Sequence, residues 1–221
     1  MRVLVLTWEY PPVSVGGLAR HVRYLVAELA RRGHLVDVVT QGGHGAPDSE
    51  ESRVGDGVLR VTRRTAYALS PLDFLHWVHQ LNYGLIEAVM GLAMAGDGGA
   101  GPAASPPFDI VHAHDWLVAF AARAAKHAYR VPLVATIHAT EAGRHHGIHN
   151  PWQRYISEIE WWLTYEAWRV ICCSGYMESE LSGQFQLPGD KIRVIPNGID
   201  PGDVDAGASG DPHGSGDSGG S

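Results

Sequence analysis

The stretch MRVLVLTWEYPPVSVGGLARHVRYLVAELARRGHLVDVVT, residues 1–40, decides the fold class. It contains two runs that are almost continuously apolar, Val3–Leu6 and Leu35–Val39, as buried parallel strands require. Between them the apolar residues recur at helical spacing, and Gly33 supplies the left-handed conformation that commonly ends a helix. The stretch therefore predicts one β-α-β unit.

The same alternation of apolar runs and amphipathic segments continues along the chain. Further apolar runs lie at 110–111, 131–137, 170–173 and 192–195. We therefore expect an α/β fold with a doubly wound, Rossmann-like parallel sheet of about six or seven strands. In such sheets ligands bind beyond the carboxyl ends of the strands.

Two later helices have recognisable start signals. One is predicted to begin at Ser70-Pro71, with Ser70 as N-cap and Asp73 in capping-box register, and to run to about Met94. The other is predicted to begin at Asn150-Pro151, with Gln153 three residues after the cap.

Three stretches do not fit packed elements. Residues 41–57 and 95–107 are rich in Gly, Pro, Ala and acidic residues, and we expect surface loops there. Residues 202–221 contain almost no large apolar side chain, so we expect a flexible tail. The domain is therefore expected to end at about residue 201.

Composition excludes several classes of protein. The formal net charge of −7 excludes a nucleic-acid binder that works through bulk positive charge. The only cysteines, Cys172 and Cys173, are adjacent in sequence, which excludes a disulfide framework and favours a reducing cytoplasm. No secretion signal is visible, and no apolar run approaches the ~20 residues of a transmembrane helix, so we expect a soluble cytoplasmic protein without a transmembrane segment.

Gly16 and Gly17 stand where the first helix begins. Glycines there let backbone N–H groups approach an anion closely, and the helix dipole adds positive charge, so a phosphate site is one interpretation. The alternative is that the pair only ends a loop. The pattern is not the dinucleotide fingerprint, because a seven-residue loop with two prolines separates the strand from the glycines.

Polar side chains also follow the strands that end near residues 113 and 137. His112 and His114 are expected to face one side of their strand, and Asp115 is a candidate cap for the helix that begins at Trp116. The segment Thr136–Arg144 is expected to be a loop that brings an imidazole, a carboxylate and a guanidinium to the same sheet edge. The alternatives are buried, hydrogen-bonded histidines and a local ion pair between Glu141 and Arg144.

Four motifs together resemble a known family. They are MRVLVLTWEYPPVSVGGLARHV (1–22), VHAHDWLV (111–118), TIHATEAGR (136–144) and VIPNGID (194–200). In this order and spacing they resemble the N-terminal half of nucleotide-sugar-dependent glycosyltransferases of the glycogen-synthase-like families 4 and 5, and α-glucan glucosyltransferases most of all. The resemblance implies a GT-B architecture, in which two Rossmann-like domains face a cleft and the N-terminal one supplies most acceptor contacts.

The resemblance also implies roles for individual residues. His138 and Asp115 match the histidine and aspartate at the catalytic site, and Gly16 and Gly17 match the glycine loop beside the donor diphosphate and sugar. Glu9, Glu141 and Arg144 are candidates for acceptor binding. The family implies no metal and no cofactor; the donor, such as ADP-glucose, UDP-glucose or GDP-mannose, is a substrate. Ser14 stands where bacterial glycogen synthases have a lysine.

The family enters its second, donor-binding domain after the VIPNGID motif, whereas this chain continues with Pro201, Gly202 and the low-complexity tail. We therefore expect the N-terminal half of a retaining hexosyltransferase that is weak or inactive alone, with a carbohydrate acceptor and a separate donor-domain chain as candidate partners. One alternative is a non-catalytic glucan-binding or sugar-binding module. Another is a metal-dependent hydrolase built on His112, His114 and His138.

Overall fold

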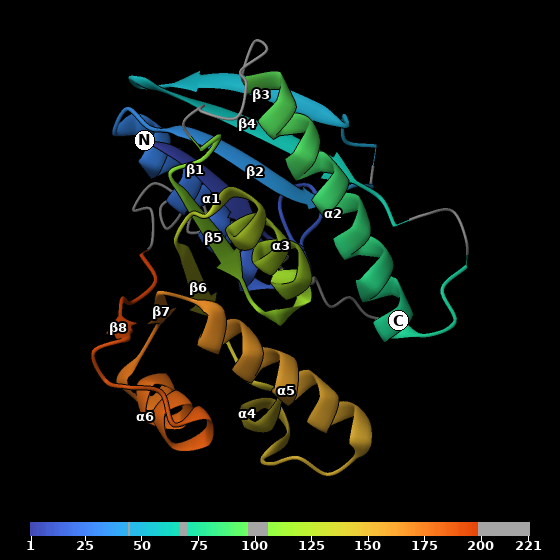
Figure 1. Cartoon of the computed structure of the whole chain (residues 1–221), viewed down its shortest axis with the longest axis vertical. Coiled ribbons are helices and arrows are strands. Elements are labelled where there is room, and N and C mark those ends of the chain that lie inside the picture. The colour runs from blue at the N-terminus through green and yellow to red at the C-terminus, as the bar shows by residue number, and fades with distance from the viewer. Residues whose placement is uncertain (44, 67–69, 97–105, 199–221) are drawn as a thin grey trace, which may run out of the picture.

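The computed structural model describes residues 1–43, 45–66, 70–96 and 106–198 (Figure 1). Within these ranges the strands are β1 (Arg2–Leu6), β2 (Leu35–Gln41), β3 (Ser49–Val54), β4 (Gly57–Arg64), β5 (Ile110–His114), β6 (Leu133–Ile137), β7 (Arg169–Cys172) and β8 (Ile192–Val194). The helices are α1 (Gly17–Arg31), α2 (Phe74–Gly96), α3 (Ala119–Tyr129), α4 (Glu141–His145), α5 (Pro151–Glu166) and α6 (Gly175–Phe185), and a short 3₁₀ helix covers Trp116–Val118.

All eight strands form one sheet in the order β3-β4-β2-β1-β5-β6-β7-β8. Every neighbouring pair is parallel except β3 and β4, which are antiparallel. The predicted α/β class and mostly parallel sheet are confirmed. The chain leaves β1 toward β2 on one side and later returns to β5 on the other, so the order reverses between β1 and β5. Ligands of doubly wound sheets bind at such a switch point.

The predicted loop over residues 41–57 is wrong for its second half. Residues 49–54 form strand β3, whose side chains are nearly all exposed and therefore carry no apolar period. The strand exists because it pairs with β4, and β4 has its own weak pattern, in which Leu59 and Val61 are buried between half-exposed Val58 and Arg60. The sheet consequently has eight strands, not six or seven.

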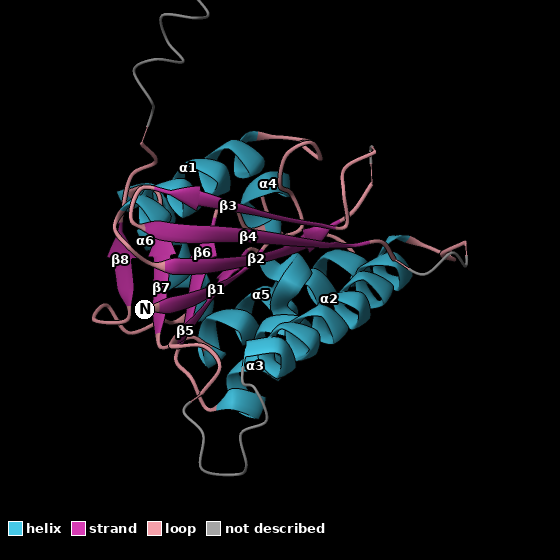
Figure 2. Cartoon of the chain, turned by 90° about the horizontal axis from the view of Figure 1, so that it is seen from above, coloured by secondary structure: helices cyan, strands magenta, loops and turns pink. Residues whose placement is uncertain are grey.

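The two faces of the sheet are covered by different helices. Figure 2 shows α1 on one side and α2, α3 and α5 on the other. Val22 and Val26 of α1 pack with Val5 and Val38 in the smaller core, whereas α2, α3, α5 and α6 enclose the larger one. Both layers fix the positions of the strand ends that carry the candidate site.

The helix boundaries mostly follow the predicted signals. Gly33 has a positive φ of 82° just after α1, and the Asn150 side chain accepts a hydrogen bond from the Gln153 amide at the start of α5, as predicted. Helix α2, however, begins at Phe74. Its cap is Asp73, whose carboxylate accepts from the His76 amide at 2.7 Å, so the predicted start at Ser70-Pro71 is wrong.

Cys172 and Cys173 are free thiols. Among the described residues no helix has the length and apolarity needed to span a membrane. The predicted tail, residues 202–221, and most of the predicted loop at 95–107 lie outside the described residues.

Candidate functional site

One cavity of about 350 Å³ lies at the carboxyl ends of β1, β5 and β6, beside the switch point. The segments that form it follow β1, β5 and β6, with contributions from α2 and α5. All seven residues predicted for the site line it: Glu9, Gly16, Gly17, Asp115, His138, Glu141 and Arg144. A larger cavity of about 660 Å³ lies between β4 and α2, but it contains none of these seven residues.

The β1–α1 loop is held from within by Glu9. This carboxylate is 3% exposed and accepts hydrogen bonds from the amides of Val15 and Gly16 at 3.0 and 3.1 Å. An internal carboxylate therefore already occupies part of the positive end of α1. The amide of Gly16, which the glycine-loop interpretation offers to a phosphate, is engaged by Glu9.

Packing within the chain does not require the two glycines. A Cβ added to Gly16 or Gly17 would meet no atom within 4 Å, and neither residue has a positive φ. Both residues line the cavity. The two glycines therefore leave room for a ligand to approach the backbone closely.

Asp115 holds the segment that follows β6. The residue has a φ of 60°, and its side chain makes no cap hydrogen bond to the 3₁₀ helix, so the predicted capping role is wrong. Instead its Oδ1 accepts from the amide of His138 at 2.8 Å, and its Oδ2 lies 4.0 Å from the Arg144 guanidinium. Burial raises the pKa of Asp115 to about 6, although these two contacts oppose the rise.

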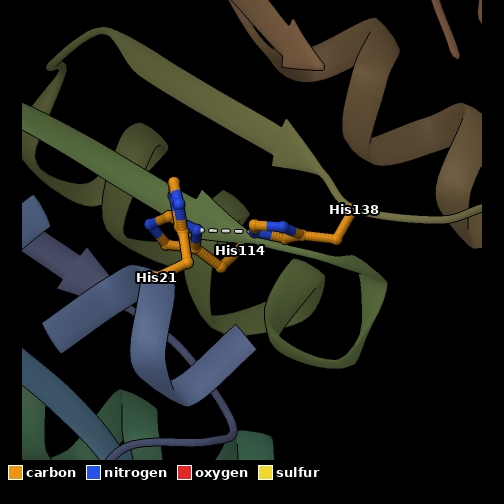
Figure 3. Close-up of side chains that lie close together, drawn as sticks. All are labelled: His21, His114 and His138. Atoms are coloured by element: carbon orange, nitrogen blue, oxygen red, sulfur yellow. Dashed lines mark hydrogen bonds between the residues drawn. The ribbon is translucent and has the colours of Figure 1, made fainter. Parts of the chain in front are cut away.

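Imidazoles surround His138. Its Nε2 lies 3.1 Å from Nδ1 of His114, and its ring centroid is 4.9 Å from that of His21 on α1. Figure 3 shows the three side chains reaching together from α1, β5 and the segment after β6. Burial lowers the pKa of His21 and His138 to about 4 and that of His114 well below its ordinary value, so all three rings are neutral at pH 7.

The candidate metal ligands differ from the predicted set. Ligand atoms of His21, His114 and His138 lie within 4.8 Å of one another, which is close enough for a metal ion. His112 lies beside His114 on the same face, as predicted, with ring centroids 4.3 Å apart, but its Nε2 bonds to Thr136 at 2.7 Å. The hydrogen bond between His114 and His138 already uses one nitrogen of each ring.

The segment after β6 is a short helix where a loop was predicted. Thr140 caps it by accepting from the Gly143 amide at 2.9 Å. The alternative of a local ion pair between Glu141 and Arg144 is not what the structure shows: Glu141 lies 3.3 Å from Nε2 of His145, and the Arg144 guanidinium lies 4.0 Å from Asp115. The local sequence thus forms α4, which turns Arg144 toward the cavity.

Glu160 was missed by the sequence analysis. It lies on α5, is 1% exposed, and both its carboxylate oxygens lie within 3.1 Å of the amide of Glu141. Burial raises its pKa to about 8. A signal was available, because Glu160 stands four residues after Ile156 and therefore on the inward face of the helix.

The charge of the cavity wall is unusual for a phosphate site. Among its described lining residues Arg144 is the one positively charged side chain at pH 7, against the carboxylates of Glu9, Asp115 and Glu141. The apolar part of the wall consists of three aromatic residues, Trp8, Phe74 and Trp116, and three aliphatic ones, Leu18, Leu117 and Ile156. Such a wall suits a neutral polyhydroxylated ligand, whose hydroxyls bond to carboxylates and whose C–H faces pack on aromatic rings.

The sequence model of the family described as Glycosyltransferase Family 4 matches residues 15–203. The chain belongs to glycosyltransferase family 4. This match confirms the resemblance read from the four motifs, and it spans three of them completely together with part of the first.

The curated relatives of this family 4 chain agree with the family match. A glycogen synthase from Mycobacterium tuberculosis is 39% identical over 207 residues, which covers 90% of this chain and 49% of the relative. An uncharacterized glycosyltransferase from Methanocaldococcus jannaschii is 36% identical over 205 residues, covering 93% of this chain and 48% of the relative. The chain thus spans about half the length of these curated relatives.

A solved structure shows the same fold. Sucrose-phosphate synthase from Thermosynechococcus elongatus matches with a TM-score of 0.69 and 19% identity, over 88% of this chain and 47% of that one. The expected GT-B-like N-terminal half is confirmed at the level of fold.

Proposed function

We propose that this family 4 glycosyltransferase chain forms the acceptor-side half of a retaining, nucleotide-sugar-dependent hexosyltransferase that transfers glucose to a glucan. The observation that carries the proposal is the convergence of seven motif residues, from three separate segments, on one cavity at the switch point of the sheet. The named glycogen synthase relative supports a glucan as acceptor and glucose as the transferred sugar.

The described residues can perform a limited set of steps. Glu9, Glu141 and Arg144 offer hydrogen-bond partners for acceptor hydroxyls, and Trp8 and Phe74 offer apolar surface for the sugar ring. His138, neutral at pH 7 and fixed by Asp115, can hydrogen-bond the transferred sugar without adding charge. In a retaining transfer of this kind the leaving diphosphate assists the incoming hydroxyl on the same face of the sugar.

The donor diphosphate needs positive charge that this wall does not supply. One guanidinium faces three carboxylates among the described lining residues, so stabilisation of the leaving group falls mainly to the second domain of the enzyme. We propose that this donor domain lies outside the matched half and that the present chain alone transfers glucose weakly or not at all.

Two assays test the proposal. The first titrates the purified chain with maltooligosaccharides; we expect binding that weakens about tenfold, or roughly 1.4 kcal/mol, in Arg144→Ala and remains unchanged in Arg154→Ala, a matched exposed arginine on α5. The second offers radiolabelled ADP-glucose, UDP-glucose or GDP-mannose together with glycogen. Absence of any glucan binding would refute the acceptor-side role, and transfer at ordinary enzymatic rates would refute the need for a second domain.

A second candidate function is a non-catalytic glucan-binding module. The acid-rich and aromatic wall favours it, because residues of this chain alone form that wall. The two candidates differ when a donor domain from a full-length relative is added: restored transfer supports the hexosyltransferase half, and unchanged glucan binding without transfer supports the module.

A further inference from the structure

The hydrogen bond between His114 and His138 has two alternative proton arrangements. A neutral imidazole has one N–H donor and one acceptor nitrogen, so either His114 Nδ1 donates to His138 Nε2 or the reverse. Both rings are neutral at pH 7, since burial holds their pKa values far below neutral. In the first arrangement His138 presents an Nδ1–H donor to the cavity, and in the second it presents a bare Nδ1 acceptor.

The far side of the His114 ring distinguishes them. His114 is fully buried, and its Nε2 has no hydrogen-bond partner in the part of the chain that the structure describes. If His114 carried its proton on Nε2, that N–H would be a buried donor without an acceptor, an arrangement that folded proteins rarely tolerate. A bare lone pair on Nε2 is the less costly alternative. The proton of His114 therefore belongs on Nδ1, which donates to His138.

We propose that His114 is a positioning residue that fixes His138 in the tautomer protonated on Nδ1. The Nε2 of His138 is then an acceptor occupied by His114, and its proton resides on Nδ1. In the described residues this Nδ1 makes no hydrogen bond, and His138 lines the cavity. His138 thus offers a ligand an N–H donor and no basic lone pair.

Neighbouring groups hold the arrangement in place. The amide of His138 donates a hydrogen bond to Asp115. The ring of His21 packs against the His138 ring in a T-shaped contact, with an interplanar angle of 71°. His112 packs beside His114 with its ring tilted by 32°, and its Nε2 bonds to Thr136; no described residue, His112 included, is a hydrogen-bond partner of His114 Nε2. The ring of His138 is therefore fixed in both position and proton placement before any ligand arrives.

The consequence for chemistry rests on the proposed function. If the cavity holds a sugar, His138 donates a hydrogen bond to a hydroxyl or ring oxygen and does not act as a general base. This agrees with a retaining transfer in which the leaving phosphate receives the acceptor proton.

Nitrogen-15 NMR of the histidine rings at pH 7 tests the inference on the intact chain without any substrate. We expect Nδ1 of His138 to be protonated and its Nε2 to be unprotonated, with Nδ1 of His114 protonated. In His114→Leu, which removes the donor, the ¹⁵N signal of His138 Nδ1 should shift toward the unprotonated range, because free imidazole side chains prefer the Nε2–H form. His112→Gln, the matched change to the neighbouring imidazole, should leave the His138 signals unchanged.

Each outcome has a defined meaning. A His138 found with its proton on Nε2 in the wild-type chain would overturn the inference, even if His114→Leu fails to fold. An unchanged Nδ1–H form in folded His114→Leu would show that another group sets the tautomer. Because the spectra need no glucan or nucleotide sugar, failure of the proposed function would appear only in the binding and transfer assays.

Discussion

At the scale of single residues, three carboxylates hold the segment that carries His138 and Arg144. Asp115 accepts from the His138 amide, Glu160 accepts from the Glu141 amide, and Glu180 accepts from the Thr140 hydroxyl. The three acids come from different elements, so the segment is fixed from several sides. Burial raises the pKa values of Asp115 and Glu160, and the stability of the fold therefore depends on pH.

Glu160→Gln tests this dependence. The pKa of Glu160 rises from 4.5 to about 8 in the folded protein, so the folded state binds its proton more tightly than the unfolded chain. Its stabilising contribution is present below pH 4.5 and is lost as the pH rises toward 8. Relative to wild type, Glu160→Gln should therefore gain free energy of unfolding between pH 5 and pH 8, on the order of 3 kcal/mol.

Urea unfolding at several pH values measures this gain. Glu158→Gln, an exposed position on the same helix, is the control and should follow the wild-type pH profile. Parallel profiles for Glu160→Gln and wild type would show that Glu160 titrates normally.

The glycines give a second test at this scale. Gly17→Ala should leave the free energy of unfolding within about 0.5 kcal/mol, because the new Cβ meets nothing within 4 Å, but it should weaken ligand binding. Gly57→Ala should instead lower the free energy of unfolding and leave ligand binding by the folded protein unchanged. Its Cβ would lie 2.3 Å from the carbonyl oxygens of Ala30 and His34, so we expect destabilisation of about 2 kcal/mol or more. Chemical denaturation and a maltooligosaccharide titration of both variants separate the two effects. Equal losses of stability would show that packing requires glycine at both positions.

At the scale of elements, α2 shows how a start signal can mislead. The Ser-Pro pair at 70–71 has the composition of a helix N-terminus, yet Asp73 three positions later makes the cap. Two candidate caps lie within one turn of each other. The first turn that forms places Phe74 against Trp116 and Trp77 against Trp8, with ring centroids 6.1 and 6.4 Å apart. Local sequence does not contain that information.

The cap itself can be measured. Asp73→Ala should lower the free energy of unfolding by about 1 kcal/mol, the usual cost of losing an N-cap. Ser70→Ala should change it little, because the helix begins after it. Thermal or urea unfolding of the two variants measures the difference. A larger loss of stability in Ser70→Ala than in Asp73→Ala would identify Ser70 as the N-cap of α2.

The strands were predictable where apolar residues follow one another in sequence. Six of the eight show as apolar runs, whereas β3 and β4 form a hairpin at the edge of the sheet with polar residues on the exposed face. Strand β3 exists only through its pairing with β4, and a pairing between strands is not encoded in the composition of either one.

At the scale of the whole molecule, seven residues that line the cavity could be named from three of the four motifs, but their surroundings could not. His21 and Glu160 contact the site from α1 and α5, far from His138 and Glu141 in sequence, and the fold brings them together. The same holds for the hydrogen bonds that the amides of Val15 and Gly16 donate to Glu9, because side-chain direction after β1 depends on the packed sheet.

The domain boundary gives a test at this scale. Residues 202–221 contain one valine and otherwise only Gly, Ser, Asp, Ala, Pro and His, so they offer little apolar surface to bury. Deleting them should leave the free energy of unfolding within about 0.5 kcal/mol of the full chain and the transition cooperative. A clear loss of stability in urea unfolding of the shortened chain would place these residues in the domain.

The balance of one guanidinium against three carboxylates along the cavity also determines which charged ligands this wall favours. Phosphate-bearing compounds would meet mostly negative charge there, and their binding would depend on groups elsewhere. Amine-containing sugar mimics, with hydroxyls for the acids and a positive nitrogen near Glu9 and Asp115, fit the same surface and would weaken in salt as ordinary ion pairs do.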